Sequence, residues 1–388
     1  MEISACVKYV GVNDHQVDLF EGQYKVPNGM SYNSYVILDD KIAIMDTVDG
    51  FFTEEWLNNV EQVLDGKMPD YLVIQHMEPD HSASIPAFLK KYPKATVVST
   101  AKGFQFMEQF FPEFFAEQGL PAEQRIVAAN DGVLELGQHS LHFVYAPMVH
   151  WPEVMMTYEA TEKILFAADG FGKFGALDAE EEWADEARRY YIGIVGKYGP
   201  QVQTVLKKAA GLDIQTICSL HGPVLKENLG FYLEKYDRWS SYQPEESGVV
   251  IAYASVYGNT RNAAEYLADV LQEKGQKTVL YDLARCDKAK AVADAFRYDR
   301  LVLAGITYNG DLFPCMRSFI EGLTERNYQN RKVAIIENGT WAPMAGKLIL
   351  GMFEKSKNLT FTETTVSIKS AMNAQNKEEI GKLAQELS

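Results

Sequence analysis

The second part of the chain alternates short apolar runs with longer amphipathic stretches. Four apolar runs have the length of buried strands: 249–254, 277–281, 301–306 and 332–336. Apolar residues recur at helical spacing between them, most clearly over 261–274, and again over 378–387. Strands that alternate with helices predict a doubly wound parallel sheet whose two faces are covered.

The first part of the chain has a less regular pattern. Short strands are predicted at 34–38 and 41–45, and the polar pair Asp39-Asp40 between them predicts a hairpin and hence a mixed sheet. Helices are predicted over 53–64, 84–92 and 101–111. The polar stretch 239–248 interrupts the periodicity and predicts a linker. We therefore expect two α/β domains, at 1–246 and 247–388.

The composition narrows the class of protein. Hydrophobic residues make up 47% of the chain and charged residues 23%, which is typical of a globular protein and not of a disordered or fibrous one. The formal net charge is −16. A chain this acidic is not expected to bind nucleic acid or anionic lipid, because phosphate recognition needs clustered cations.

Targeting and cysteine patterns give further expectations. The chain does not begin with a cationic segment that leads into an apolar run, and its apolar runs are shorter than a membrane span. We therefore expect a cytoplasmic protein. The cysteines form no Cys-x-x-Cys pair, so we expect neither a disulfide framework nor a cysteine-held iron or zinc centre; they are Cys6, Cys218, Cys286 and Cys315.

The densest group of metal-capable side chains follows the apolar residues 71–74. It consists of His76, Glu78, Asp80 and His81. Alternate side chains of an extended backbone face the same side, so the first three are expected to converge, with His81 in the turn that follows. The ionised carboxylates would repel one another unless they shared a cation.

Three further apolar runs end in a candidate ligand: 141–149 at His150, 163–168 at Asp169 and 215–220 at His221. Sites of α/β folds gather at strand ends, so we expect all seven side chains to share one crevice. Taken alone, His150 or His221 is better explained as a hydrogen-bonded core histidine, and Asp169 as a turn residue. The combination with the first cluster favours a metal site.

The donor set indicates which metals fit. Four imidazoles and three carboxylates exceed the needs of one ion and suit two ions that share a carboxylate. Carboxylate-rich nitrogen and oxygen sets suit iron or manganese, whereas sets dominated by histidine favour zinc. The residues therefore predict a dinuclear centre, with iron favoured over the other metals.

The order His-x-Glu-x-Asp-His, followed by His, Asp and His, resembles the metallo-β-lactamase superfamily. Glu78, where the hydrolases usually have histidine, is the variation found in flavodiiron proteins. The resemblance implies an αββα domain and assigns ligands to two irons: His76, Glu78 and His150 to one, Asp80, His81 and His221 to the other, with Asp169 as the bridge. Some members turn the histidine at the His81 position away from the metal, so that ligand stays open.

The second domain has three polar loops at predicted strand ends. The first opens a helix with hydroxyls, a glycine and free N–H groups, which suits one phosphate: Ser255, Val256, Tyr257, Gly258, Asn259 and Thr260. The other two combine an aromatic residue with amides: Thr307, Tyr308, Asn309 and Gly310, then Asn338, Gly339, Thr340, Trp341 and Ala342. Each loop alone is equally well explained by helix capping or loop packing. Together they suit a flat heteroaromatic ring.

Residues 248–388 resemble a short-chain flavodoxin. The resemblance implies FMN, with its phosphate in the first loop and its isoalloxazine at the other two. Tyr257 stands where free flavodoxins commonly have threonine, so backbone groups are expected to supply that phosphate contact. A lactamase-like diiron domain followed by a flavodoxin domain resembles the flavodiiron (A-type flavoprotein, rubredoxin:oxygen oxidoreductase) family. No rubredoxin-like cysteine set follows, which indicates the minimal two-domain class.

The resemblance implies an oxidoreductase that reduces O2 to water with electrons delivered through FMN from a carrier such as rubredoxin. Reduction of NO to N2O at the same site is the alternative. It also implies a head-to-tail homodimer, or a dimer of dimers, in which each FMN faces the partner's irons. Two functions of other classes stay open: a metal-dependent hydrolase with a flavodoxin docking module, and an electron carrier with a vestigial metal site.

Overall fold

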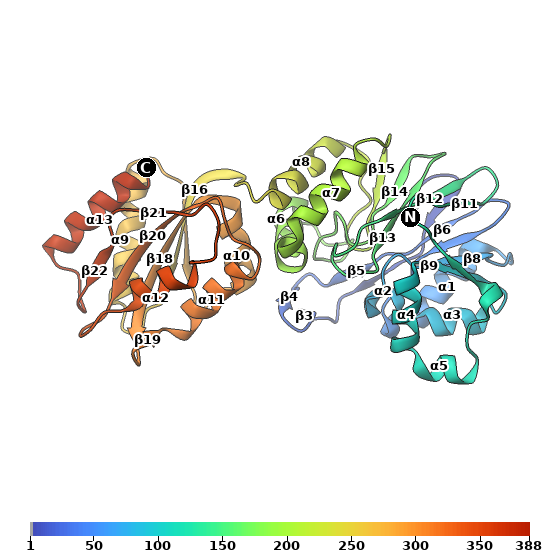
Figure 1. The fold of residues 1–388 in the computed structure, drawn as a ribbon, viewed down its shortest axis with the longest axis horizontal. Coiled ribbons are helices and arrows are strands. Elements are labelled where there is room, and N and C mark those ends of the chain that lie inside the picture. Colours follow the sequence, from blue (N-terminus) through green and yellow to red (C-terminus); the bar gives the residue numbers. More distant parts are fainter. Residues whose placement is uncertain (1–2) are drawn as a thin grey trace. The chain divides into compact units, whose positions relative to one another are not determined.

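The structure, a computed structural model, describes residues 3–388. It divides the chain into two compact units (Figure 1). The first combines the chain up to Tyr191 with Pro200–Tyr236, and the second combines Ile192–Gly199 with Asp237–Ser388. The short segment Ile192–Gly199 was not predicted to belong to the second unit, where the guanidinium of Arg326 donates to the carbonyl of Gly193 (3.2 Å).

Two sheets form the centre of the first unit. One has six strands in the order β1 (Val7–Tyr9), β6 (Tyr35–Ile37), β7 (Ala43–Met45), β8 (Tyr71–Val73), β9 (Thr96–Ser99) and β10 (Arg125–Val127). The other has five in the order β11 (Val133–Glu135), β12 (Ser140–Tyr145), β13 (Met155–Glu159), β14 (Ile164–Phe166) and β15 (Thr216–Cys218). Strands β6 and β7 pair antiparallel, which confirms the hairpin predicted at Asp39-Asp40.

Helices lie beside both sheets (Figure 1). The first sheet is accompanied by α1 (Thr53–Leu64), α2 (Pro79–Ser82), α3 (Ile85–Lys91), α4 (Ala101–Phe110) and α5 (Pro112–Glu117), and the second by α6 (Trp183–Tyr190), α7 (Gly199–Ala209) and α8 (Leu229–Ser240). Two small ribbons complete the unit: β2 (Val12–Asp14) with β5 (Met30–Tyr32), and β3 (Leu19–Phe20) with β4 (Tyr24–Lys25).

The core of the first unit lies between its two sheets. Met45 and Val73 from the first sheet and Phe143 from the second belong to one buried cluster. The rings of Tyr35 and Phe166 meet across this layer at a centroid distance of 5.4 Å. Because both sheets bury one face against this core, the ends of their strands are held at fixed positions relative to each other.

The second unit is built on one parallel sheet. Its strands follow the order β17 (Thr278–Asp282), β16 (Glu246–Tyr253), β18 (Tyr298–Tyr308), β20 (Lys332–Asn338) and β21 (Thr360–Phe361), with β22 (Val366–Ile368) beside β20 and β19 (Asp311–Leu312) antiparallel to β18. The helices are α9 (Asn259–Glu273), α10 (Lys288–Arg297), α11 (Pro314–Thr324), α12 (Ala345–Met352) and α13 (Ala374–Glu386).

Both faces of this sheet are buried. Val249 and Ile251 of β16 belong to a core cluster that includes Leu267 of α9 and Leu383 of α13. The alternate residue Val250 is also fully buried. A strand buried on both faces explains why the sequence has a continuous apolar run here. The αββα unit followed by a doubly wound parallel sheet confirms the predicted fold class.

The predicted linker at 239–248 is shorter in the structure. Helix α8 continues through Ser240 and β16 begins at Glu246. The aromatic rings of Trp239 and Tyr242 are buried. The polar residues around these two aromatic side chains interrupt the apolar pattern, so the predicted linker is too long at both ends. Within residues 3–388, no helix has the length and apolar character needed to cross a membrane.

Candidate metal centre and flavin site

The seven predicted metal-capable side chains lie together in the first unit. They form two groups, and within each group the ligand atoms lie within 4.8 Å of one another. The first group holds His76, Glu78, His150 and Asp169, and the second holds Asp80, His81 and His221. The predicted convergence at one crevice is thus present, with a division between the groups that the sequence pattern did not show.

Strand ends position three of these seven side chains directly. His76, Asp169 and His221 each occupy the third position after their strands, which are β8, β14 and β15. His150 is placed differently, because β12 ends at Tyr145 and the apolar run to residue 149 turns instead of continuing as a strand. In that turn the N–H of Val149 donates to the carbonyl of Ala146 (3.1 Å).

Asp80 departs from the prediction that it would converge with His76 and Glu78 along a strand. Pro79 begins the one-turn helix α2, and Glu78 is its N-cap. Proline fixes the backbone angle that a first helical turn requires, so the extended backbone ends at this point. Asp80 consequently lies on the helical turn with His81 and belongs to the second group.

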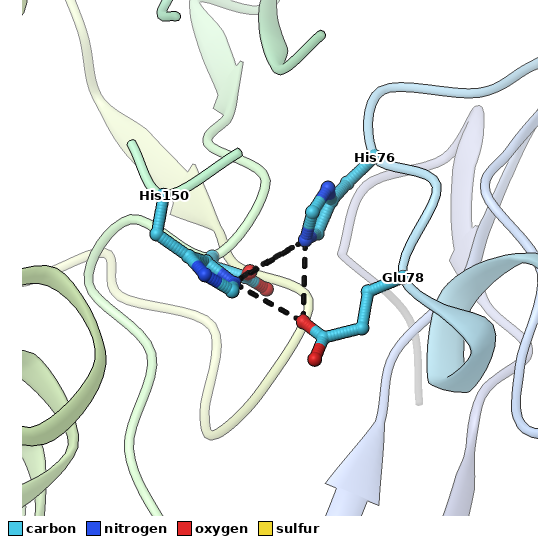
Figure 2. Close-up of side chains that lie close together, drawn as sticks. His76, Glu78 and His150 are labelled. Atoms are coloured by element: carbon cyan, nitrogen blue, oxygen red, sulfur yellow. Dashed lines mark hydrogen bonds and ion pairs between the residues drawn. The ribbon is translucent and has the colours of Figure 1, made fainter. Parts of the chain in front are cut away.

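The first group has the spacing of ligands around a common ion. Figure 2 shows the three labelled side chains pointing toward one another. The Nε2 atom of His76 lies 3.3 Å from both Glu78 Oε2 and His150 Nε2, and the latter two atoms lie 3.1 Å apart. Atoms about 2.1 Å from a shared ion lie roughly 3.0–3.4 Å apart in octahedral or tetrahedral arrangements. The side chains therefore leave room for a metal ion among them.

Asp169 connects the two groups through its two oxygens. Oδ2 lies 3.3 Å from His76 Nε2 and 3.0 Å from His150 Nε2. Oδ1 lies 3.3 Å from His81 Nε2 and 3.7 Å from His221 Nε2. The residue is buried, and neither oxygen has a hydrogen-bond partner among the described residues. Burying an unpartnered carboxylate is costly, so a pair of cations, one for each oxygen, fits this arrangement.

The second group contains a further unpartnered carboxylate. Both oxygens of Asp80 are buried without a hydrogen bond. His221 Nε2 lies 3.3 Å from Asp80 Oδ2 and 3.1 Å from His81 Nε2. In this geometry His81 faces the group instead of turning away from it. Together, the orphaned oxygens and the nitrogen and oxygen donors fit two iron ions.

Charge balance shifts the acidity of these groups. Burial alone would raise the pKa of the Asp169 carboxyl, but the surrounding imidazoles, His76 first, outweigh burial and hold it well below its usual range. Burial would lower the pKa of His150, yet the neighbouring carboxylates of Asp169 and Glu78 raise it to about 9. Metal ions would therefore displace protons from these imidazoles when they bind.

Outer contacts orient the imidazoles, and the sequence pattern missed them. The Nδ1 atom of His76 lies 2.7 Å from Glu153 Oε1, which also accepts the N–H of Met77 at 2.9 Å. The Nδ1 atom of His221 lies 2.7 Å from the carbonyl oxygen of Ser31. Such contacts direct the opposite ring nitrogen toward a metal. The proximity of Glu153 to His150 in the sequence was the only available signal.

Tyr190 is another residue that the sequence pattern missed. It is buried, and its ring lies 5.4 Å from that of His221. Its hydroxyl has no hydrogen-bond partner among the described residues. Burial, followed by the charges of Asp169 and Glu78, raises the pKa of this hydroxyl well above its usual value, so it keeps its proton.

The second unit has a cavity of about 700 Å³ at the carboxyl ends of β16, β18 and β20. Every predicted flavin-loop residue lines it except Gly258: Ser255, Val256, Tyr257, Asn259, Thr260, Thr307, Tyr308, Asn309, Gly310, Asn338, Gly339, Thr340, Trp341 and Ala342. The sequence pattern missed three lining residues, Ile306, Met344 and Ser370. The volume is that of a pocket for a cofactor-sized molecule.

The first loop ends in a glycine whose backbone other residues rarely adopt. Gly258 has φ +90° and is the N-cap of α9, with no side-chain hydrogen bond to the helix start. Its own N–H donates to Ser255 Oγ (3.1 Å). The first N–H groups of α9 therefore have no side-chain acceptor at the cap, as is typical of a phosphate site.

The other two loops form walls for a flat ring. Trp341 of the third loop is largely exposed, as is Tyr257 of the first loop. Thr307 Oγ1 accepts the N–H groups of Met344 and Ala345, so this threonine caps α12. Asn338 donates to the carbonyl of Ser370 (2.8 Å) and thereby fixes the third loop. Exposed aromatic side chains on fixed loops fit a flavin ring.

Comparisons with known proteins agree with both sites. A family model described as ODP family beta lactamase matches residues 30–222, and a flavodoxin domain model matches 250–360. The whole chain aligns with rubredoxin oxygen:oxidoreductase from the anaerobe Desulfovibrio gigas at 25% identity, covering 97% of that chain with a TM-score of 0.91. The chain belongs to the flavodiiron protein family.

Two further relatives support this assignment. The flavodiiron protein from Giardia intestinalis is 26% identical, with 100% of this chain and 95% of that chain covered and a TM-score of 0.91. The nitric oxide reductase from Moorella thermoacetica is 29% identical over 88% of this chain and 86% of that protein. As a flavodiiron protein, the chain is an oxidoreductase of the family that reduces O2 or NO, which confirms the predicted enzyme class.

The outer contact to His76 is expected to control metal affinity in this flavodiiron protein. Glu153→Gln removes the negative charge beside Nδ1, so the imidazole becomes a weaker donor and iron affinity should fall about 10–100-fold. Iron retained after dialysis against a graded series of chelator concentrations measures this change. The exposed Glu123→Gln is the matched control and should retain iron like the wild type. Equal retention in both variants would contradict the role of Glu153.

The glycine of the first loop is expected to control FMN affinity. Gly258→Ala places a side chain at φ +90°, where an added Cβ meets only the side chain of Arg261 at 3.6 Å. The alanine loop is expected to relax away from this conformation in the free protein, so that FMN binding has to restore it at a cost of about 1–2 kcal/mol and is weakened roughly 5–30-fold. Gly275→Ala is the matched control, because Gly275 has a similar φ of +76° and open space around it, so the same backbone cost arises away from the cavity. Titration of flavin-free protein should separate the two variants.

Proposed function

We propose that this chain reduces O2 to water at a dinuclear iron centre, with electrons that arrive through FMN. One iron would be held by His76, Glu78 and His150, the other by Asp80, His81 and His221, with Asp169 between them. The observation that supports this most directly is the position of Asp169, whose two oxygens each face one group. A bridging carboxylate suits a substrate that needs two metals.

The electron count favours O2. Its conversion to two waters consumes four electrons and four protons. When bound, two irons that are each oxidised by one electron and a flavin that is oxidised by two would together supply four electrons. The relative named rubredoxin oxygen:oxidoreductase, which aligns over the whole chain, supports the same choice.

NO reduction is the second candidate function. Two NO molecules, two electrons and two protons give N2O and one water, so a reduced iron pair suffices. The specific observation in its favour is the similarity to a protein named nitric oxide reductase, at 29% identity over most of both chains. Both reactions use the same side chains, so the choice between them depends on relative rates.

The chain's own residues would fix the geometry and exclude water. Asp169 would hold the two ions at one separation, while Glu153 and the Ser31 carbonyl keep the imidazoles in orientation. His76, His81 and His221 are fully buried, which limits access of bulk water to the centre. The Tyr190 hydroxyl keeps its proton and has no acceptor, so it is available to donate a hydrogen bond.

FMN is the proposed cofactor of the second unit. Its phosphate would lie at residues 255–260 and its ring between residues 307–310 and 338–342, which line one cavity with the exception of Gly258. A carrier such as rubredoxin is the proposed electron donor, in line with the name of the Desulfovibrio gigas relative. The head-to-tail homodimer, or a dimer of dimers, stays a prediction.

The decisive experiment combines metal analysis with anaerobic stopped-flow spectroscopy. Purified protein should contain about two irons and one FMN per chain, whereas two zincs would favour the hydrolase alternative. Fully reduced protein is then mixed with O2 and, separately, with NO. Faster reoxidation by O2 supports oxygen reduction, and faster reoxidation by NO transfers the assignment to the second candidate.

Loss of the shared carboxylate should abolish gas reduction. Asp169→Ala removes the group that faces both metal positions and leaves two cations uncompensated, so turnover should fall below detection while FMN stays bound. The control is Asp178→Ala, which removes an exposed carboxylate from the segment that follows. Oxygen consumption and FMN content are measured on both. Full turnover by Asp169→Ala with normal iron content would refute the diiron assignment.

Electron entry should require a separate carrier. The described cysteines form no cluster that could hold an iron–sulfur centre: Cys6, Cys218, Cys286 and Cys315. NADH alone should therefore support little oxygen consumption, and the addition of a rubredoxin with its reductase should restore it. An oxygen electrode records both conditions on the same sample. Rapid oxidation of NADH by the pure protein would contradict the proposed route.

A further inference from the structure

A third group of metal-capable side chains lies in the first unit, apart from the two groups joined by Asp169. Cys6 Sγ, a ring nitrogen of His139 and a carboxylate oxygen of Glu162 lie within 4.8 Å of one another. Cys6 precedes β1, His139 lies in the turn between β11 and β12, and Glu162 lies in the turn between β13 and β14. The three residues are far apart in the sequence, which explains why no spacing motif revealed them.

A carboxylate orients the ring of His139 in the way that is typical of metal-bound histidines. Its Nδ1 atom lies 2.8 Å from Asp39 Oδ2, and its backbone N–H donates to the same oxygen at 2.7 Å. Both side chains are almost fully buried. A carboxylate on one ring nitrogen orients the other nitrogen and makes it a better ligand. Nε2 of His139 thereby faces Glu162, and Cys6 belongs to the same group.

The contact between His139 and Glu162 is too long for a charged hydrogen bond. Nε2 lies 3.5 Å from Glu162 Oε1, whereas Asp39 achieves 2.8 Å on the other nitrogen. Charge-assisted hydrogen bonds are usually about 2.7–2.9 Å long. Two ligands about 2.1 Å from a tetrahedral ion lie roughly 3.4 Å apart. The observed separation therefore matches ligands on either side of an ion.

The local charges also favour a cation. The Oε2 atom of Glu162 is buried and has no hydrogen-bond partner within residues 3–388. Glu159 is fully buried next to it and holds the turn by accepting the N–H groups of Thr161 and Glu162. Burial first, and then the charges of Glu162 and Asp39, raise the pKa of the Cys6 thiol. A divalent ion would offset the carboxylates and stabilise the thiolate.

This third group lies at the opposite ends of the strands from the proposed diiron centre. Strand β12 begins just after His139 and leads toward His150. Strand β14 begins just after Glu162 and leads to Asp169. Cys6 lies next to the end of β6, because Val7 pairs with Ile37 and the N–H of Leu38 donates to the Cys6 carbonyl. The two sites therefore do not share a ligand.

We propose that Cys6, His139 and Glu162 bind one Zn²⁺ ion, with Asp39 as the positioning residue behind His139. A thiolate, an imidazole and a carboxylate form a borderline-soft set that suits zinc, and a water would complete the tetrahedron. The ion would tie the segment before β1 to two turns of the second sheet. It differs from the diiron centre in having a sulfur ligand.

The test uses iron-loaded, FMN-containing protein equilibrated with Zn²⁺ in a chelator buffer. We expect one zinc per chain beyond the unchanged iron content, by elemental analysis. X-ray absorption at the zinc edge should show one sulfur neighbour at about 2.3 Å. Because the proposed diiron ligands include no sulfur, this signal cannot arise from zinc in that centre. A zinc shell of only nitrogen and oxygen, or no zinc uptake, would overturn the proposal.

Variants make the test specific. Cys6→Ser should lose the sulfur neighbour and bind zinc more than about 10-fold more weakly, whereas Cys286→Ser, a partly exposed cysteine of the second unit, should behave like the wild type. Glu162→Gln keeps the sulfur neighbour but should also weaken binding, and it removes an oxygen that no donor stabilises. Zinc should raise the unfolding temperature of the wild type and of Cys286→Ser but not of Cys6→Ser. Unchanged zinc affinity in Cys6→Ser would refute the site.

Discussion

The shared carboxylate of Asp169 is the constraint on which the first unit depends. Its oxygens face imidazoles on two sides, and neither has a hydrogen bond that would stabilise it. Such a residue can be buried only when positive charge surrounds it, as protons on the imidazoles or as metal ions. The packing of two sheets, which brings β8, β14 and β15 to the same edge, supplies that surrounding charge from segments distant in the sequence.

The second unit, which is built on one parallel sheet, also places its candidate site at the carboxyl ends of strands. Its loops must present backbone N–H groups and flat aromatic surfaces, so the important residues are those that fix backbone conformation. Gly258 supplies a left-handed turn, Thr307 caps α12, and Asn338 holds the loop at Ser370. The sequence marks these positions as polar loop residues, but only the structure distinguishes those that line the cavity from those that shape it.

Periodicity predicted the fold well because local and tertiary preferences agree. Helix α1 matches its predicted bounds, and the parallel strands of the second unit are buried on both faces, as their apolar runs indicated. The strand ends also predicted which side chains gather. Strand alternation grouped Asp80 with His76 because it does not show that Pro79 ends the extended backbone, whereas the family resemblance grouped Asp80 with His81 and His221, as the structure does. Glu153 was missed because its role depends on a contact with His76. Such contacts have no periodic signature.

The equal offsets of His76, Asp169 and His221 from their strands have a consequence for chain length. An insertion or deletion between any of these strands and its ligand would move one donor away from the others, so the geometry fixes the number of residues at this edge. The turns at the opposite edge carry no such restriction, because a change there leaves the offsets intact. We therefore expect length changes to be tolerated at one edge of the two-sheet sandwich and to disrupt the metal-capable groups at the other.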